Sequence, residues 1–321
     1  MRALPLRPQF AWLEITGFCN LNCRHCYANS SSQGDHGDMS DADWIRVIDQ
    51  LNGLGVRDVQ FIGGEPTLHQ SLPAFIRHAH KYAMRIEVFS NMTHIRPEVW
   101  EALTLPGVRL AFSYYSDNET DHDEVTEVRG SHARTRANVE KARELGIKMR
   151  GSVIHVLEGQ REANAHHELL QLGIRDVRTD HIRPFGRGAE GAFPQIKELC
   201  GMCGRAKFAV LPDGRVSPCV FSRWMNLGNV HNQTLQEIYD GVPMRAARAE
   251  LEAAFPHSAV RSTPSCLPDC NPSFESCNPQ TACAPDAACG PTGEGDGSAV
   301  PRMSPRRSVR YANPSISRTD C

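Results

Sequence analysis

Three cysteines near the beginning of the chain stand close enough together to bind one iron–sulfur cluster. They form the run Cys19-Asn-Leu-Asn-Cys23-Arg-His-Cys26, with the spacing C-x-x-x-C-x-x-C. A four-iron cubane usually takes four cysteine thiolates, one for each iron. A site that supplies three leaves one iron open to another ligand, and an open position is typical of a metal centre that does chemistry. The alternative is a structural zinc knuckle, with His25 or His36 as the fourth ligand.

The distribution of the 12 cysteines along the 321 residues separates two regions. None lies between residues 27 and 199, eight lie between 200 and 289, and Cys321 ends the chain. Disulfide frameworks are typical of short secreted domains, and no apolar segment of the secretory-signal type follows the first residues. We therefore expect a cytoplasmic protein with two separate metal-binding regions.

Composition excludes several classes of function. The 35 Lys and Arg against 37 Asp and Glu give a formal charge of −2, which favours neither a nucleic-acid nor a membrane-surface partner. No apolar run approaches the roughly 20 residues that span a bilayer. Length predicts roughly two domains.

The segment before the second cysteine group alternates strand-like and helix-like patterns. The strand-like stretches lie at residues 10–15, 56–62, 84–89, 108–112, 149–156 and 177–182. The helical patterns lie at residues 40–51, 72–79, 133–145 and 162–172. Such alternation predicts a parallel sheet with outer helices. Pattern alone leaves open or closed α/β barrels and a doubly wound sheet as equal choices.

Motifs at three successive strand ends resemble the signature of the radical SAM superfamily. The cysteine run follows the first predicted strand, Gly63-Gly64-Glu65-Pro66 follows the second as in that family's GGEP motif, and Ser90-Asn91 ends the third. The resemblance implies that S-adenosylmethionine chelates the open iron of a [4Fe–4S] cluster. It also implies further cofactor-binding residues: Gly63, Gly64 and Glu65 at the methionyl amine, Ser90 and Asn91 at the ribose and carboxylate, and His25 or Tyr27 near the adenine.

The same resemblance implies a fold and a reaction. The fold is an α/β protein, a partial (β/α)6 TIM-like barrel with a small cysteine-rich auxiliary cluster domain. The reaction is reductive cleavage of S-adenosylmethionine to a 5′-deoxyadenosyl radical, which abstracts hydrogen from a substrate C–H bond. We expect a radical SAM core over residues 1–190, an auxiliary iron–sulfur domain over 191–291 and a disordered tail over 292–321.

The second cysteine region resembles the SPASM or twitch extension of that superfamily. Cys200-Gly-Met-Cys203 is followed by Gly214 and Cys219 in the extension's spacing, and the upstream 183–188 and downstream 227–239 segments also match. The next five cysteines depart from the extension's spacing, and each has a proline two residues later: Cys266, Cys270, Cys277, Cys283 and Cys289. The eight thiols suffice for two auxiliary [4Fe–4S] clusters. One cluster with spare thiols and a merely cysteine-rich tail are the alternatives.

Relatives with this extension mostly modify ribosomally made peptides, so the resemblance implies peptide maturation by cross-linking, epimerisation or oxidation. The alternatives are a dehydrogenase or epimerase of a sugar or another small-molecule natural product, and a non-enzymatic metal-binding scaffold. A reductant such as a flavodoxin or ferredoxin is an expected partner. Only about eight residues precede the first strand, so we expect a separate peptide-recognition protein or direct capture of a short precursor. Polar strand-end residues are candidate substrate contacts: Tyr114, Tyr115, Ser116, Asp117, Asp180 and Arg183.

Overall fold

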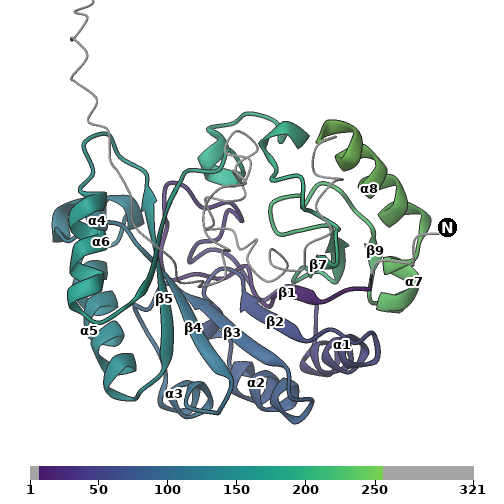
Figure 1. The fold of residues 1–321 in the computed structure, drawn as a ribbon, viewed down its shortest axis with the longest axis horizontal. Coiled ribbons are helices and arrows are strands. Elements are labelled where there is room, and N and C mark those ends of the chain that lie inside the picture. Colours follow the sequence, from purple (N-terminus) through teal and green to yellow (C-terminus); the bar gives the residue numbers. More distant parts are fainter. Residues whose placement is uncertain (1–6, 256–321) are drawn as a thin grey trace, which may run out of the picture. The chain divides into compact units, whose positions relative to one another are not determined.

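The computed structural model describes residues 7–255, in which strands and helices alternate as the sequence predicts (Figure 1). The described strands form one sheet in the order β6-β5-β4-β3-β2-β1-β7-β8-β9. The parallel strands of the first half are β1 (Phe10–Glu14), β2 (Asp58–Ile62), β3 (Arg85–Ser90), β4 (Val108–Tyr114), β5 (Lys148–His155) and β6 (Asp176–His181). Because β6 and β9 end the sheet within the described part, the barrel is partial, which confirms the expected fold.

Helices follow the outside of the curved sheet (Figure 1). Four match the predicted patterns: α1 (Asp41–Gly53), α2 (Leu72–Lys81), α5 (Ser131–Glu144) and α6 (Glu162–Gln171). Helix α1 begins with a capping box, in which Ser40 and Asp43 each accept from the other's backbone N–H. The sequence patterns missed α3 (Pro97–Leu103), α4 (Glu119–Thr126) and α8 (Val242–Ala254). No helix of the described part is long and apolar enough to cross a membrane.

Alternate residues of each strand face opposite sides of the sheet. Ala11 and Leu13 of β1 belong to the main core together with the buried side chains of α1. Trp12 belongs to a second apolar cluster that includes Cys203 and Cys219. Both faces of β1 are therefore buried, each in a different core.

The second cysteine region continues the same sheet. Strands β7 (Lys207–Val210) and β8 (Arg215–Ser217) form an antiparallel hairpin around Pro212-Asp213-Gly214, a sequence typical of a tight turn. Strand β7 pairs in parallel with β1, and β9 (Gly228–Asn229) pairs with β8. The short helix α7 (Leu235–Tyr239) follows and begins with a capping box between Thr234 and Glu237. The expected domain boundary near residue 190 stays a prediction, and the predicted tail over 292–321 lies outside the described residues.

Candidate functional site

The loop between β1 and α1 carries the first three cysteines and is fixed by backbone hydrogen bonds. Cys19 is buried and its N–H donates to the Ser31 carbonyl at 3.0 Å. The N–H groups of Asn22 and Arg24 donate to carbonyls at the C-terminal end of α4, each at 3.1 Å. Helix α4, which the sequence patterns missed, is thus one of the elements that position the cysteines.

A second clamp on this loop comes from the segment after β6. Arg187 donates through Nε to the Cys23 carbonyl and through Nη2 to the Ser30 carbonyl, both at 2.8 Å. Its backbone N–H donates to the Cys26 carbonyl at 2.9 Å. Gly186 has φ +56°, and a Cβ there would lie 2.4 Å from the Cys26 carbonyl oxygen. The segment and the cysteine loop therefore pack backbone against backbone.

The two glycines after β2 are required by contact with the cysteine loop itself. A Cβ on Gly64 would lie 2.1 Å from the Phe18 carbonyl oxygen, and one on Gly63 would lie 2.4 Å from that of Thr16. Instead, Gly64 and Glu65 donate their N–H groups to Thr16 and Phe18, at 2.7 and 2.8 Å. The family resemblance places these glycines beside a bound ligand. In the structure, they also allow the backbone of the cysteine loop to approach closely.

Glu65 joins the ends of β2 and β3 through its buried carboxylate. Oε1 accepts from the hydroxyls of Thr67 at 2.6 Å and Ser90 at 2.8 Å, and Oε2 accepts from the Asn91 N–H at 2.6 Å. The Asn91 side-chain amide reaches the Cys19 Sγ at 3.7 Å. Burial raises the pKa of Glu65, although these hydrogen bonds oppose the shift. The three predicted motifs thus meet in one hydrogen-bonded site.

The two aromatic candidates beside the cysteines lie on different sides of the loop. His25 stacks edge-on against Tyr115 at 5.2 Å between ring centroids, whereas Tyr27 packs edge-on against Phe221 at 5.1 Å. The buried Nδ1 of His25 and the hydroxyl of Tyr27 have no hydrogen-bond partner within the protein. Burial lowers the pKa of His25 to about 4, so its imidazole is neutral near pH 7.

The chemistry of the first three cysteines fits an iron–sulfur cluster. Burial raises the pKa of Cys19 to about 12 and raises that of Cys23, so both thiols stay protonated near pH 7 unless a cation binds. Iron ions reverse this effect, because a coordinating thiol is deprotonated. Within residues 7–255, no group of His, Cys, Asp or Glu side chains is arranged for a single metal ion.

The second set of described cysteines gathers in the smaller apolar cluster. The Sγ atoms of Cys203 and Cys219 lie 3.0 Å apart, and a hydrogen bond with Cys200 contributes to the raised pKa of Cys203. These three are predicted auxiliary ligands that the tertiary structure brings together. The other predicted ligands lie outside the described residues: Cys266, Cys270, Cys277, Cys283 and Cys289.

A buried ion pair, which the sequence analysis missed, connects the two regions. Glu14 at the end of β1 is fully buried and pairs with Arg223, four residues after Cys219. Its Oε2 atom has no hydrogen-bond partner. Burial raises the pKa of Tyr27, and the charges of Glu14 and Arg223 act on this pKa in opposite directions. The sequence contains one signal for this pair, because Glu14 is a charged residue at the end of the otherwise apolar strand β1.

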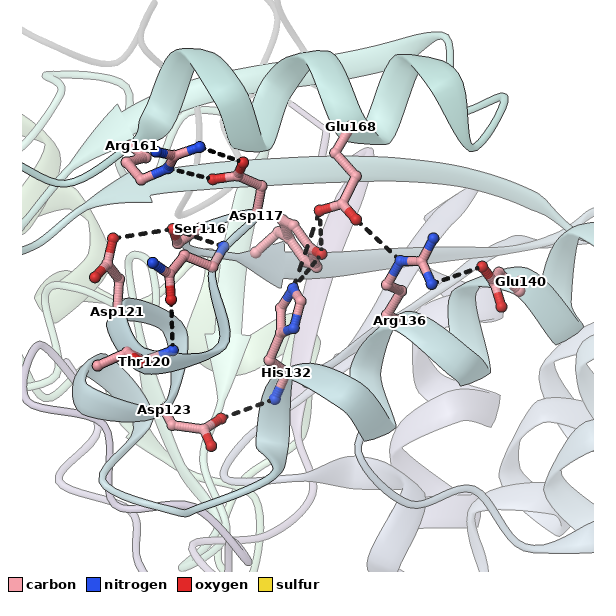
Figure 2. Close-up of polar contacts among 12 residues, drawn as sticks. Ser116, Asp117, Thr120, Asp121, Asp123, His132, Arg136, Glu140, Arg161 and Glu168 are labelled. Atoms are coloured by element: carbon pink, nitrogen blue, oxygen red, sulfur yellow. Dashed lines mark hydrogen bonds and ion pairs between the residues drawn. The ribbon is translucent and has the colours of Figure 1, made fainter.

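Several predicted substrate contacts are engaged elsewhere (Figure 2). Tyr114 donates from its hydroxyl to Glu168 at 2.7 Å and contacts His132 at 2.8 Å, on the helix side of the sheet. Asp117 forms a two-point ion pair with Arg161. Neighbouring residues of a strand point to opposite faces of the sheet, and the side chain of Tyr114, the last residue of β4, points to the helix side. Asp180 and Arg183 pair with each other at 3.0 Å.

Two family models match the chain. The Radical SAM superfamily matches residues 13–170, and an iron–sulfur cluster-binding domain, SPASM, matches residues 200–271. These ranges contain both described cysteine sets.

Individual proteins are similar to this chain in sequence or in fold. The AdoMet-dependent heme synthase of Methanosarcina barkeri is 28% identical over 59% of this chain and 55% of its own length. The antilisterial bacteriocin subtilosin biosynthesis protein AlbA of Bacillus subtilis is 25% identical over 73% of this chain and 60% of its own. Streptococcus suis SuiB bound to its precursor peptide SuiA shares the fold, with a TM-score of 0.65 at 16% identity over 76% of this chain and 67% of that chain.

The chain spans little more than half the length of the first two of these relatives. The matched ranges nevertheless include both described cysteine sets and the strand-end motifs. The first family implies S-adenosylmethionine with a [4Fe–4S] cluster as cofactors. The second implies auxiliary iron–sulfur centres. The chain therefore belongs to the radical SAM superfamily and carries a SPASM-type iron–sulfur cluster-binding domain.

Proposed function

We propose that this protein cleaves S-adenosylmethionine reductively and uses the resulting 5′-deoxyadenosyl radical to modify a peptide. One observation carries the first half of the proposal. Asn91 donates to Glu65 through its backbone and to the Cys19 sulfur through its side chain, so three strand ends converge at one site. Ligands of parallel α/β folds bind at this edge of the sheet.

The chain's own residues then have separate tasks in this site. When bound and reduced, the cluster supplies the electron that splits the sulfonium of S-adenosylmethionine. Cys19, Cys23 and Cys26 would hold the cluster and leave one iron open. The carboxylate of Glu65 would accept from the methionyl ammonium, and Asn91 and Ser90 would fix that carboxylate. His25 and Tyr27 would border the adenine and exclude water.

Similarity to peptide maturases supports the peptide as substrate. Relatives include AlbA, named for subtilosin biosynthesis, and the sporulation killing factor maturation protein SkfB of Bacillus subtilis, which is 30% identical over 56% of this chain. The match of an iron–sulfur cluster-binding domain of the SPASM type to residues 200–271 also supports a substrate of this kind. A small-molecule substrate is the second candidate, because a relative named as a heme synthase also matches.

The test uses the full chain, reconstituted anaerobically with iron and sulfide. With dithionite and S-adenosylmethionine, it is expected to form 5′-deoxyadenosine, detected by liquid chromatography and mass spectrometry. The matched control replaces Cys19, Cys23 and Cys26 with alanine and is expected to form none. Absence of 5′-deoxyadenosine from the wild-type protein with a full iron content overturns the proposal. Short peptides encoded beside the gene then distinguish a peptide substrate from a small molecule by a mass change.

A further inference from the structure

Tyr115 is placed where its hydroxyl reaches the cysteine loop. It follows β4, is 4% exposed, and its Oη lies 4.0 Å from the Cys23 Sγ and 3.4 Å from the His25 Nε2. Neighbouring Tyr114 points to the opposite face of the strand. Of these two adjacent tyrosines, only Tyr115 therefore contacts the cluster loop.

Donor and acceptor chemistry fixes the direction of this contact. A thiolate can accept but not donate, so the Tyr115 O–H must donate to the Cys23 sulfur once iron is bound. In the tautomer that carries its proton on Nε2, the His25 ring donates to the Tyr115 oxygen. The two side chains form a chain of donors that ends at the sulfur.

The rest of the structure holds the Tyr115 ring in place. The ring of His122 packs edge-on against it, with 5.0 Å between centroids. The Tyr115 carbonyl accepts from the Gln160 side-chain amide at 2.6 Å, and the same amide donates to Ile154 at the end of β5. The hydroxyl is therefore presented to the sulfur by a rigid surrounding rather than by a mobile surface side chain.

We propose that Tyr115, oriented by His25, is a positioning residue that raises the reduction potential of the cluster held by Cys23. The inference rests on the proposed function, because it assumes that cluster. One electron adds negative charge to the cluster and its sulfurs, and a hydrogen bond to a ligand sulfur stabilises the more negative state. The Tyr115 hydroxyl keeps its proton throughout, and no covalent bond changes.

The test is a reductive titration of the reconstituted protein, followed by the electron paramagnetic resonance signal of the reduced cluster. Auxiliary centres are removed in a background variant in which all eight cysteines from Cys200 to Cys289 are replaced by alanine, so that one signal remains. In that background Tyr115→Phe is expected to lower the equilibrium constant for reduction about tenfold, a shift of about 59 mV to more negative potential. Tyr114→Phe is the matched control, since the Tyr114 hydroxyl bonds to Glu168 and His132 instead.

Equal potentials in the Tyr115→Phe and Tyr114→Phe variants overturn the inference, as does a shift to more positive potential. If Tyr115→Phe does not retain iron, the His25→Phe variant tests the inference instead. This variant keeps the Tyr115 hydroxyl but removes the imidazole that donates to it. That variant is expected to shift in the same direction by less, and no shift refutes the proposal. If the potential shifts as expected but no 5′-deoxyadenosine forms, the proposed function is contradicted and the inference about Tyr115 is not.

Discussion

Arg187 donates from its Nε to the carbonyl oxygen of Cys23 at 2.8 Å, across 164 positions of sequence. The same guanidinium donates to the Ser30 carbonyl, so one side chain joins two points of the cysteine loop. The segment after β6 therefore holds the loop that follows β1, although β6 lies at the far end of the sheet. A partial barrel can bring these segments together because its sheet curves.

Replacement of Arg187 by glutamine is expected to loosen the cysteine loop. The change removes two hydrogen bonds from a charged donor to half-buried carbonyls, so we expect the free energy of unfolding to fall by about 1.5–3 kcal/mol. Iron retention should fall with it. Urea unfolding and iron content measure both effects. The control Arg161→Gln breaks an exposed pair with Asp117 and should change neither. Unchanged iron retention in the Arg187 variant would show that the clamp is dispensable.

Gly64→Ala is expected to prevent normal cluster assembly. The added Cβ would lie 2.1 Å from the Phe18 carbonyl oxygen, one residue before Cys19, and neither backbone can yield without displacing the loop. Iron per chain after reconstitution and the circular dichroism spectrum report assembly and folding separately. Gly53→Ala at the end of α1 meets nothing within 4 Å and serves as the control, with normal iron content expected. A Gly64 variant with full iron content would contradict the steric argument.

Cys203→Ala with Cys219→Ala is expected to lower the iron content by about four per chain, the content of one cubane. The Cys19, Cys23 and Cys26 variant should lose a similar amount, and the two losses should add, because the sets lie on different loops. Colorimetric iron analysis after anaerobic reconstitution gives the numbers. Cys321, which the sequence leaves outside both groups, provides a control substitution. Iron content that does not change in the double variant would exclude these two cysteines as ligands.

The buried imidazole of His122 predicts a dependence of stability on pH. Burial and, second, the nearby His132 lower its pKa to about 3, while Asp123 acts in the opposite direction. Unfolded His122 binds a proton near its ordinary pKa of about 6.5, whereas the folded form does not. Stability is therefore lost as the pH falls below about 6.5, by about 2 kcal/mol at pH 5.

His122→Phe should remove this part of the pH dependence, because phenylalanine keeps the edge-on contacts with Tyr114 and Tyr115 and does not titrate. The measurement compares urea unfolding of both proteins at pH 7.5 and pH 5. Equal losses of stability in the two proteins would show that His122 does not cause the effect. Tyr114 and Tyr115 titrate far above this range, because burial raises the pKa of each.

The sequence by itself predicted the order of the parallel strands and the residues of the first candidate site. Strand and helix patterns predicted the parallel sheet, since apolar periodicity is a local property of the chain. The cysteine run, Gly63-Gly64-Glu65 and Ser90-Asn91 stood at strand ends that a parallel sheet must bring to one edge. Helices α3, α4 and α8 were missed; α3 and α8 bury several apolar residues, whereas α4 buries only one, Val125.

Only the tertiary structure decided which distant groups meet. The pairing of β7 with β1, the reach of Arg187 to Cys23 and the ion pair of Glu14 with Arg223 join segments far apart in sequence. The choice of Tyr115 rather than Tyr114 at the cluster loop depends on the register of β4, because a shift of one residue exchanges the two faces of a strand. Such contacts follow from sheet curvature and register, which no local pattern of residues contains.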